Sequence, residues 1–246
     1  MLDPTPEIHS PDAGGTPARR VGAHGAPAQA LPDLLLIERA RAGDGRAIEA
    51  LIRRYSRRLF RAAHSVLGDE ERAEAAVRAA CLTAFGDLSR YESSGKFAAW
   101  LTRLACVQAR ALRSAARSAE HPAGPAQPDS APAVPAPSGP GDELQERREL
   151  ERIIGRLPEV FRTVFVLRII EGVSGIETAA SLAVHETTVR TRLYRAQRRL
   201  GADTVRHMRA APALLVPTAA CTERLVTAVL GAPPQGSMLT ISASPP

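Results

Sequence analysis

Residues 185–200 read HETTVRTRLYRAQRRL, and this stretch decides the fold. Its apolar residues Val189, Leu193, Ala196 and Leu200 follow an i, i+4, i+7, i+11 spacing, which places them in one stripe along an α-helix. Threonine, arginine and tyrosine side chains occupy the opposite face of the same helical wheel. One side is therefore expected to pack and the other to present cations, hydroxyls and an aromatic ring. A solvated amphipathic helix is the plainer alternative.

The residues before this stretch favour the DNA-binding interpretation. Residues 174–177 read SGIE, an S-x-x-E capping box that predicts a short helix to about Leu182, and residues 183–185 form a tight turn. A short helix, a turn and a second helix with a cationic face make a helix-turn-helix, whose second helix enters the DNA major groove. The predicted DNA-contacting residues of that helix are Thr187, Thr188, Arg190, Thr191, Tyr194, Arg195 and Arg198.

The composition agrees with a polyanionic partner. The 246 residues carry a formal net charge of +6 and a pI near 10.0, which favours nucleic acid or an acidic membrane surface. Lys96 is the only lysine, and the planar fork of arginine suits phosphate and guanine recognition. A G+C-rich coding sequence would produce the same arginine bias.

Several classes of protein are disfavoured. Cys81, Cys106 and Cys221 are far apart and lack C-x-x-C spacing, which argues against a disulfide framework or a structural zinc site. No apolar run approaches the roughly 18 residues that span a bilayer, and residues 1–20 have no continuous apolar core. We therefore expect a cytoplasmic protein without membrane insertion. With no nucleophile motif, phosphate loop or metal-ligand cluster, we expect neither an enzyme nor a bound cofactor or metal.

The pattern of the whole chain predicts an all-α protein with two small helical domains joined by a Pro/Ala-rich linker. The first domain is expected to hold helices over 33–43, 44–67, 69–88 and 97–116, and the second over 142–156, 158–172, 174–182 and 186–200. The predicted divisions are a disordered tail over 1–32, the first domain over 33–118, the linker over 119–141, the second domain over 142–207 and a C-terminal extension over 208–246.

Both domains resemble parts of one known family. Residues 157–200, with their leading LPE, the EG before the helix-turn-helix and the string TVRTRLYRA, look like region 4 of bacterial sigma factors in the extracytoplasmic-function (ECF) group. Residues 36–77 and the string KFAAWLTRLA at 96–105 are similar to region 2 of the same group. The string AACTERLVTAVL at 219–230 also resembles a short Cys-containing helix that follows region 4 in some members.

The resemblance implies a factor that binds core RNA polymerase and directs promoter-specific transcription initiation. Region 2 would dock on the clamp of the β′ subunit and engage the minus-ten element, and region 4 would bind the flap of the β subunit and read the minus-thirty-five element. An anti-sigma factor is a further candidate partner. Matching the family's motifs, the region 2 candidates for DNA contact are Lys96, Phe97, Trp100, Arg103 and Arg110. For Phe97 and Trp100, packing in the core is the alternative.

The sequence departs from the family mainly in region 2. The helix expected to contact the polymerase carries Glu74, Ala75, Arg78 and Ala79, where the family usually has an Asp at position 75, a Gln at 78 and an acid at 79. Each lost charge-assisted contact costs about 1.5–3 kcal/mol. His185 stands where Ser is common, so the recognition helix loses its expected N-cap. A divergent sigma factor and a sigma-derived DNA-binding regulator that no longer forms a productive holoenzyme both fit these residues.

Overall fold

The computed structural model describes residues 31–91, 96–119, 142–210 and 214–232. These residues form helices and connecting turns with no β-strand among them, so the prediction of an all-α protein is confirmed. The predicted linker over 119–141 and the predicted tail over 1–32 fall almost wholly outside the described residues. Within the described ranges, no helix combines the length and the apolar character that crossing a membrane requires.

The first domain is a helical bundle built from α1 (Asp33–Arg41), α2 (Gly45–Leu67), α3 (Glu70–Gly86) and α4 (Phe97–Ala119). Local signals set the helix ends. The Asp44 and Asp69 side chains cap α2 and α3 by accepting hydrogen bonds from the amides of Arg46 and Arg72, and Gly68 ends α2 with a φ of 71°. The core is made mostly of Leu, Ile, Val and Ala side chains from all four helices, with Phe97 and Tyr91 at one end.

The second domain contains α5 (Asp142–Gly155), α6 (Glu159–Phe165), α7 (Gly175–Leu182), α8 (Glu186–Leu200) and α9 (Ala202–Ala210). Its own core joins α5, α6, α8 and α9 through Leu150, Ile154, Phe165, Ala196 and Met208, which are all nearly inaccessible to solvent. The predicted single helix over 158–172 is instead α6 followed by a π-helical turn over Val166–Ile170. The predicted domain boundary at 207 lies inside α9.

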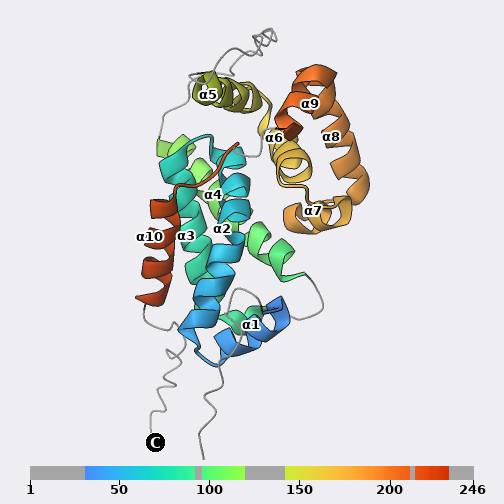
Figure 1. Ribbon diagram of the computed structural model, residues 1–246. Helices are drawn as coiled ribbons and strands as arrows, with labels where there is room; N and C mark the ends of the chain where they lie inside the picture. Colours follow the sequence, from blue (N-terminus) through green and yellow to red (C-terminus); the bar gives the residue numbers. More distant parts are fainter. Residues whose placement is uncertain (1–30, 92–95, 120–141, 211–213, 233–246) are drawn as a thin grey trace, which may run out of the picture.

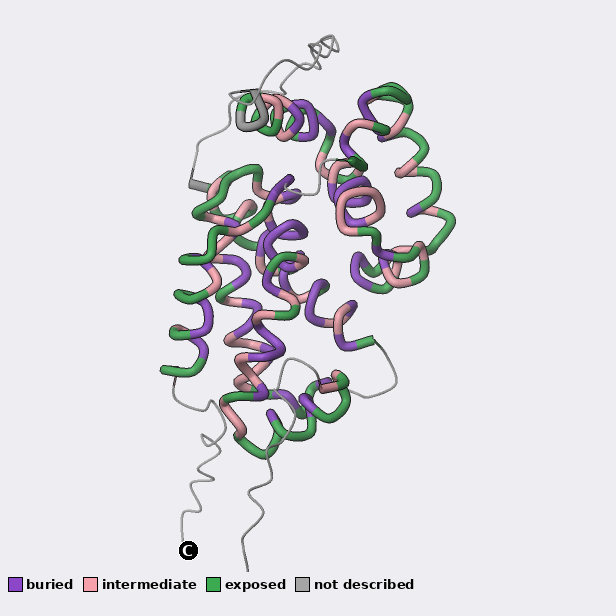
Figure 2. The backbone as a smooth tube through the Cα atoms, viewed as in Figure 1, coloured by how far each residue is buried: buried purple, intermediate pink, exposed green. Residues whose placement is uncertain are grey.

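The two domains pack against each other. A third apolar cluster joins Ala62 of α2 and Cys106 of α4 to Val164, Leu167, Val173, Leu182 and Val189 of the second domain. Figure 2 shows buried backbone on the facing sides of the two groups of helices. The helix-turn-helix is therefore held against the first domain rather than extending freely from it.

A final helix, α10 (Ala219–Leu230), returns to the first domain. It lies along α2 and α3, on the side of the bundle away from α7 and α8 (Figure 1). The first domain is therefore completed by a segment that follows the second domain in the chain.

Candidate nucleic-acid interface

The helix-turn-helix forms where the sequence predicts it, with one change in its cap. The Ser174 hydroxyl accepts a hydrogen bond from the Glu177 amide at 3.2 Å and begins α7. Ala183 takes the left-handed conformation, with φ of 53° and ψ of 49°, and turns the chain toward α8. The capping box is only half formed, because the Glu177 carboxylate contacts Arg58 and Lys96 and not the backbone amide of Ser174. His185 precedes α8 without a side-chain capping hydrogen bond.

The two faces of α8 divide as the helical wheel predicts. Val189 and Ala196 are buried, and Leu193 is partly buried beside them. On the other side, Thr188 is partly exposed and the remaining predicted contact residues are exposed, namely Thr187, Arg190, Thr191, Tyr194, Arg195 and Arg198. Because the buried stripe fixes the rotation of the helix, this second set faces outward as a group.

The outer face of α8 is cationic and only loosely tied to the protein. Arg190 lies 3.8 Å from Glu186, and the Arg198 guanidinium carbon lies 5.8 Å from the centre of the Tyr194 ring. The Thr191 hydroxyl donates to the Thr187 carbonyl at 2.9 Å. These weak contacts leave the arginines able to reorient, and their forked donors suit phosphate oxygens and guanine edges.

The five region 2 candidates lie in different environments. Phe97 is 3% exposed and makes edge contacts with Tyr91 and Tyr55 at ring-centre distances of 5.1 and 5.8 Å, so for this residue the core-packing alternative is what the structure shows. Trp100 is half-buried against the same aromatic group. Arg103 is exposed on α4.

The two remaining cations face the second domain. Lys96 Nζ lies 3.1 Å from a Glu177 carboxylate oxygen, and Arg110 Nε lies 3.3 Å from Glu159. In this arrangement, acidic side chains of the second domain form ion pairs with cations that the family resemblance assigns to promoter contact.

Buried ion pairs hold the two domains together. Arg58 of α2 contacts the other oxygen of Glu177 at 2.5 Å, and the two side chains are largely buried, at 11% and 13% exposed. Burial acts to raise the pKa of Glu177, but hydrogen bonds and charge from Arg58 and Lys96 outweigh it and lower that pKa. Arg61, with 3% of its side chain exposed, contacts Glu171 at 2.6 Å and donates to the Leu214 carbonyl.

These interface residues have no signal of their own in the sequence. Arg58 and Arg61 lie in the run of arginines along α2, and Glu177 belongs to the predicted capping box. Nothing local indicates their partners, which are more than 100 residues away in the chain. Glu177 stands in the first turn of α7 and Glu171 directly follows the π-helical turn, and neither position signals an arginine on α2.

The helix expected to contact the polymerase is also partly covered. Arg78 is exposed on α3, Ala75 and Ala79 are partly buried, and the Glu74 side chain is 18% exposed. Glu74 forms two hydrogen bonds with Arg224 of α10, at 2.8 and 2.6 Å.

All three cysteines are free and buried, an environment in which a thiol behaves as a small apolar side chain. Burial raises the pKa of Cys81 to about 12 and that of Cys106 to about 11. Among the described residues, no group of three or more His, Cys, Asp or Glu side chains could hold a metal ion.

Comparison with known proteins matches both domains to parts of one family. Residues 51–118 match the model of sigma-70 region 2, and residues 147–200 match the model of sigma-70 region 4. The chain is 30% identical over 159 residues to the ECF RNA polymerase sigma factor SigM of Mycobacterium tuberculosis, covering 65% of this chain and 78% of that protein.

Two further relatives have similar coverage. The chain is 29% identical to the RNA polymerase sigma factor NccH of Alcaligenes xylosoxydans xylosoxydans, over 69% of this chain and 93% of that protein. It is 28% identical to the RNA polymerase sigma-H factor of Pseudomonas aeruginosa, over 67% of this chain and 90% of that protein. Both the region 2 and region 4 resemblances are therefore supported.

Proposed function

The chain belongs to the sigma-70 family of RNA polymerase sigma factors, in its ECF group, and from that premise we propose how its two domains divide promoter recognition. As a sigma factor, it binds core RNA polymerase and promoter DNA and directs transcription initiation. In our proposal α8 enters the major groove of the minus-thirty-five element, and the second domain binds the β flap. The first domain contacts the minus-ten element and binds the β′ clamp.

One observation carries the assignment of α8. Its buried stripe leaves six of the seven predicted contact residues exposed on a single face. Base readout needs such a face, because phosphate contacts give affinity and register while side chains on base edges give sequence preference. A well-placed bidentate arginine–guanine pair contributes about 1–3 kcal/mol of discrimination. Arg190 and Arg195 are the side chains that we assign to this readout, with Thr191 and Tyr194 beside them.

The packed arrangement of the two domains adds a step to promoter binding. Glu177 and Glu159 pair with Lys96 and Arg110, so these two carboxylates compete with DNA phosphates for the cations while the domains are docked. We infer that region 2 makes full use of these residues only after the second domain has left the first. Separation then frees the cations at the same moment as it allows the two domains to reach separate promoter elements.

The test is promoter selection by reconstituted holoenzyme. Full-length protein with core polymerase selects from a DNA library randomised through the minus-thirty-five element, and the Arg195→Ala variant repeats the selection. We expect the variant to lose preference at one or two base pairs. The matched control is Arg90→Ala, which removes an exposed arginine from the first domain. An Arg195→Ala selection identical to that of the parent protein would refute the assignment of the α8 face.

A uniform loss of affinity has a different meaning. If Arg195→Ala weakens binding to every sequence equally and lowers the salt dependence by about one phosphate contact, then Arg195 contacts the backbone and reads no base. The same full-length protein also distinguishes a sigma factor from a sigma-derived DNA-binding regulator. A regulator would bind DNA but would not co-elute with core polymerase.

A further inference from the structure

Helix α10 lies outside both matched regions, yet it packs into the first domain. The matches end at residues 118 and 200, whereas α10 spans Ala219–Leu230. Its start is well defined, because the Thr218 hydroxyl accepts a hydrogen bond from the Cys221 amide at 3.2 Å. A helix that the matched domains do not include has therefore been added to the surface of α2 and α3.

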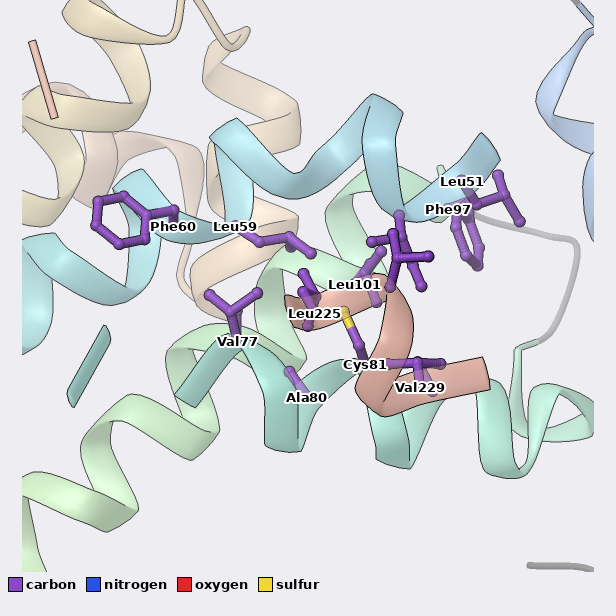
Figure 3. Close-up of a cluster of buried hydrophobic side chains, with 14 of the residues drawn as sticks. Leu51, Leu59, Phe60, Val77, Ala80, Cys81, Phe97, Leu101, Leu225 and Val229 are labelled. Atoms are coloured by element: carbon purple, nitrogen blue, oxygen red, sulfur yellow. The ribbon is translucent and has the colours of Figure 1, made fainter. Parts of the chain in front are cut away.

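The inner face of α10 is apolar and closely packed. Cys221, Leu225, Val226 and Val229 are all less than 10% exposed and follow an i, i+4, i+5, i+8 spacing. Figure 3 shows Leu225 and Val229 beside Cys81 of α3, in the same cluster as Val77 and Ala80. The surface that α10 covers is thus an apolar groove that accepts one amphipathic helix.

Charges on both sides of this stripe fix the position of α10. Arg224 pairs with Glu74 of α3 through two hydrogen bonds, and Glu223 pairs with Arg53 of α2 at 2.6 and 2.9 Å. The hydrogen bonds from Arg224 hold the pKa of Glu74 below its ordinary value. Glu223 and Arg224 are adjacent on α10 but pair with different helices, so the two pairs together specify the direction and register of the docked helix.

The covered surface overlaps, at Glu74, the one assigned to core polymerase. Of Glu74, Ala75, Arg78 and Ala79, only Glu74 is a carboxylate, and Arg224 occupies both of its oxygens. Arg78 lies four residues from Glu74, on the same side of α3. A polymerase surface that binds the Glu74 carboxylate must therefore displace Arg224 of α10.

We propose that α10 and core RNA polymerase compete for the groove between α2 and α3, and that α10 fills this groove in the free protein. The inference rests on the proposed polymerase contact of α3. Its partner is a surface with an apolar ridge and a cation that replaces Arg224 on Glu74. Binding then requires α10 to lift, and the apparent affinity falls by the fraction of molecules in which α10 is lifted.

The experiment measures the Kd of the full-length protein for core polymerase. Leu225→Glu places a charge in the apolar groove and displaces α10, and Leu230→Glu makes the same change at an exposed position of the same helix. If α10 is lifted in about one parent molecule in ten, the apparent affinity of the parent is about tenfold below that of a protein with α10 fully displaced. We therefore expect Leu225→Glu to bind core polymerase at least ~10-fold more tightly than the parent. Leu230→Glu should stay within about twofold of the parent value.

A milder variant tests the same proposal without a charge in the apolar core. Arg224→Ala removes only the ion pair with Glu74. Arg206→Ala, which removes another exposed and paired arginine, is its control. We expect an intermediate gain in affinity from Arg224→Ala and none from the control. A peptide of residues 214–232 added to the Leu225→Glu variant should restore weaker polymerase binding, because it refills the groove.

The outcomes separate the two proposals. If parent and variants all bind with one Kd, or if Leu225→Glu and Arg224→Ala bind more weakly, α10 does not compete and this inference fails while the sigma factor function stands. If neither the parent nor any α10 variant binds core polymerase, the assigned polymerase contact and the inference fail together.

Discussion

Replacement of Glu177 by glutamine should loosen the packing between the two domains. Glutamine keeps the size of the side chain and one carbonyl acceptor, so the change removes mainly the charge. Arg58 is then left in a largely buried position without a full anionic partner. Removing one member of a buried pair costs about 3–5 kcal/mol, and the exposed pair with Lys96 adds at most about 1 kcal/mol. The retained amide contact offsets part of this cost.

We take about 3 kcal/mol for the net loss, which corresponds to a roughly 100-fold fall in the docking equilibrium constant. The helix-turn-helix should survive, because the Ser174 cap uses the backbone amide of residue 177 and not its side chain. The substitution therefore tests the docking of the domains separately from the folding of α7.

Fluorescence energy transfer between the domains provides the assay. Ala111→Cys on α4 and Ala202→Cys on α9 place dyes at exposed positions, and the native cysteines are buried. We expect the loss of energy transfer to move to a lower urea concentration in Glu177→Gln. Glu38→Gln, which removes a charge from the largely exposed pair with Arg41, is the control. Equal midpoints for Glu177→Gln and the parent would refute the assigned role of the Arg58–Glu177 pair.

Three further predictions concern stability. Burial lowers the pKa of His64, which is also influenced by Glu151, Arg162, Glu70 and Asp69. Since the unfolded chain binds this proton at a higher pH than the folded protein, the free energy of unfolding should fall as the pH drops below about 6.5. In urea unfolding, the free energy of unfolding of His64→Gln should change less between pH 7.5 and 5.5 than that of the parent. An equal change in both proteins would contradict the assignment. Asp69→Ala removes the acceptor for the Arg72 amide at 2.7 Å and should cost about 1 kcal/mol, whereas an unchanged urea midpoint would show that the cap contributes nothing. Leu101→Ala, at a fully buried position of α4, should cost about 2–5 kcal/mol, and thermal unfolding within 1 °C of the parent would show that the site repacks.

The features that the sequence predicted well depend on neighbouring residues. Asp44, Asp69 and Gly68 act within one helical turn of their own positions, so the ends of α2 and α3 follow from local capping rules. The rotation of α8 follows from its apolar stripe for the same reason. The predicted helix over 158–172 contains a π-helical turn over Val166–Ile170 that no local pattern indicated, and Leu167 of this turn belongs to the apolar cluster with Ala62 and Cys106 of the first domain.

The features that escaped prediction depend on distant partners. The capping rule predicted a reciprocal role for the Glu177 carboxylate, but a buried arginine on α2 competes more strongly for it. Phe97 matched an aromatic position of the family, yet its neighbours Tyr55 and Tyr91 enclose it in the core. A helix over 219–230 was expected only from the family resemblance, and nothing in that resemblance indicated which helices it would cover.

The place of α10 in the chain has a consequence during synthesis on the ribosome. The helices of the first domain are complete at Ala119, and α10 begins about 100 residues later at Ala219. At ordinary translation rates of about 5–20 residues per second, the groove between α2 and α3 stays uncovered for roughly 5–20 seconds. Throughout that interval a nascent chain presents Glu74 and the apolar side chains around Cys81 to the surrounding solution. The emerging protein is therefore open to partners, and to aggregation, on a surface that the finished protein keeps closed.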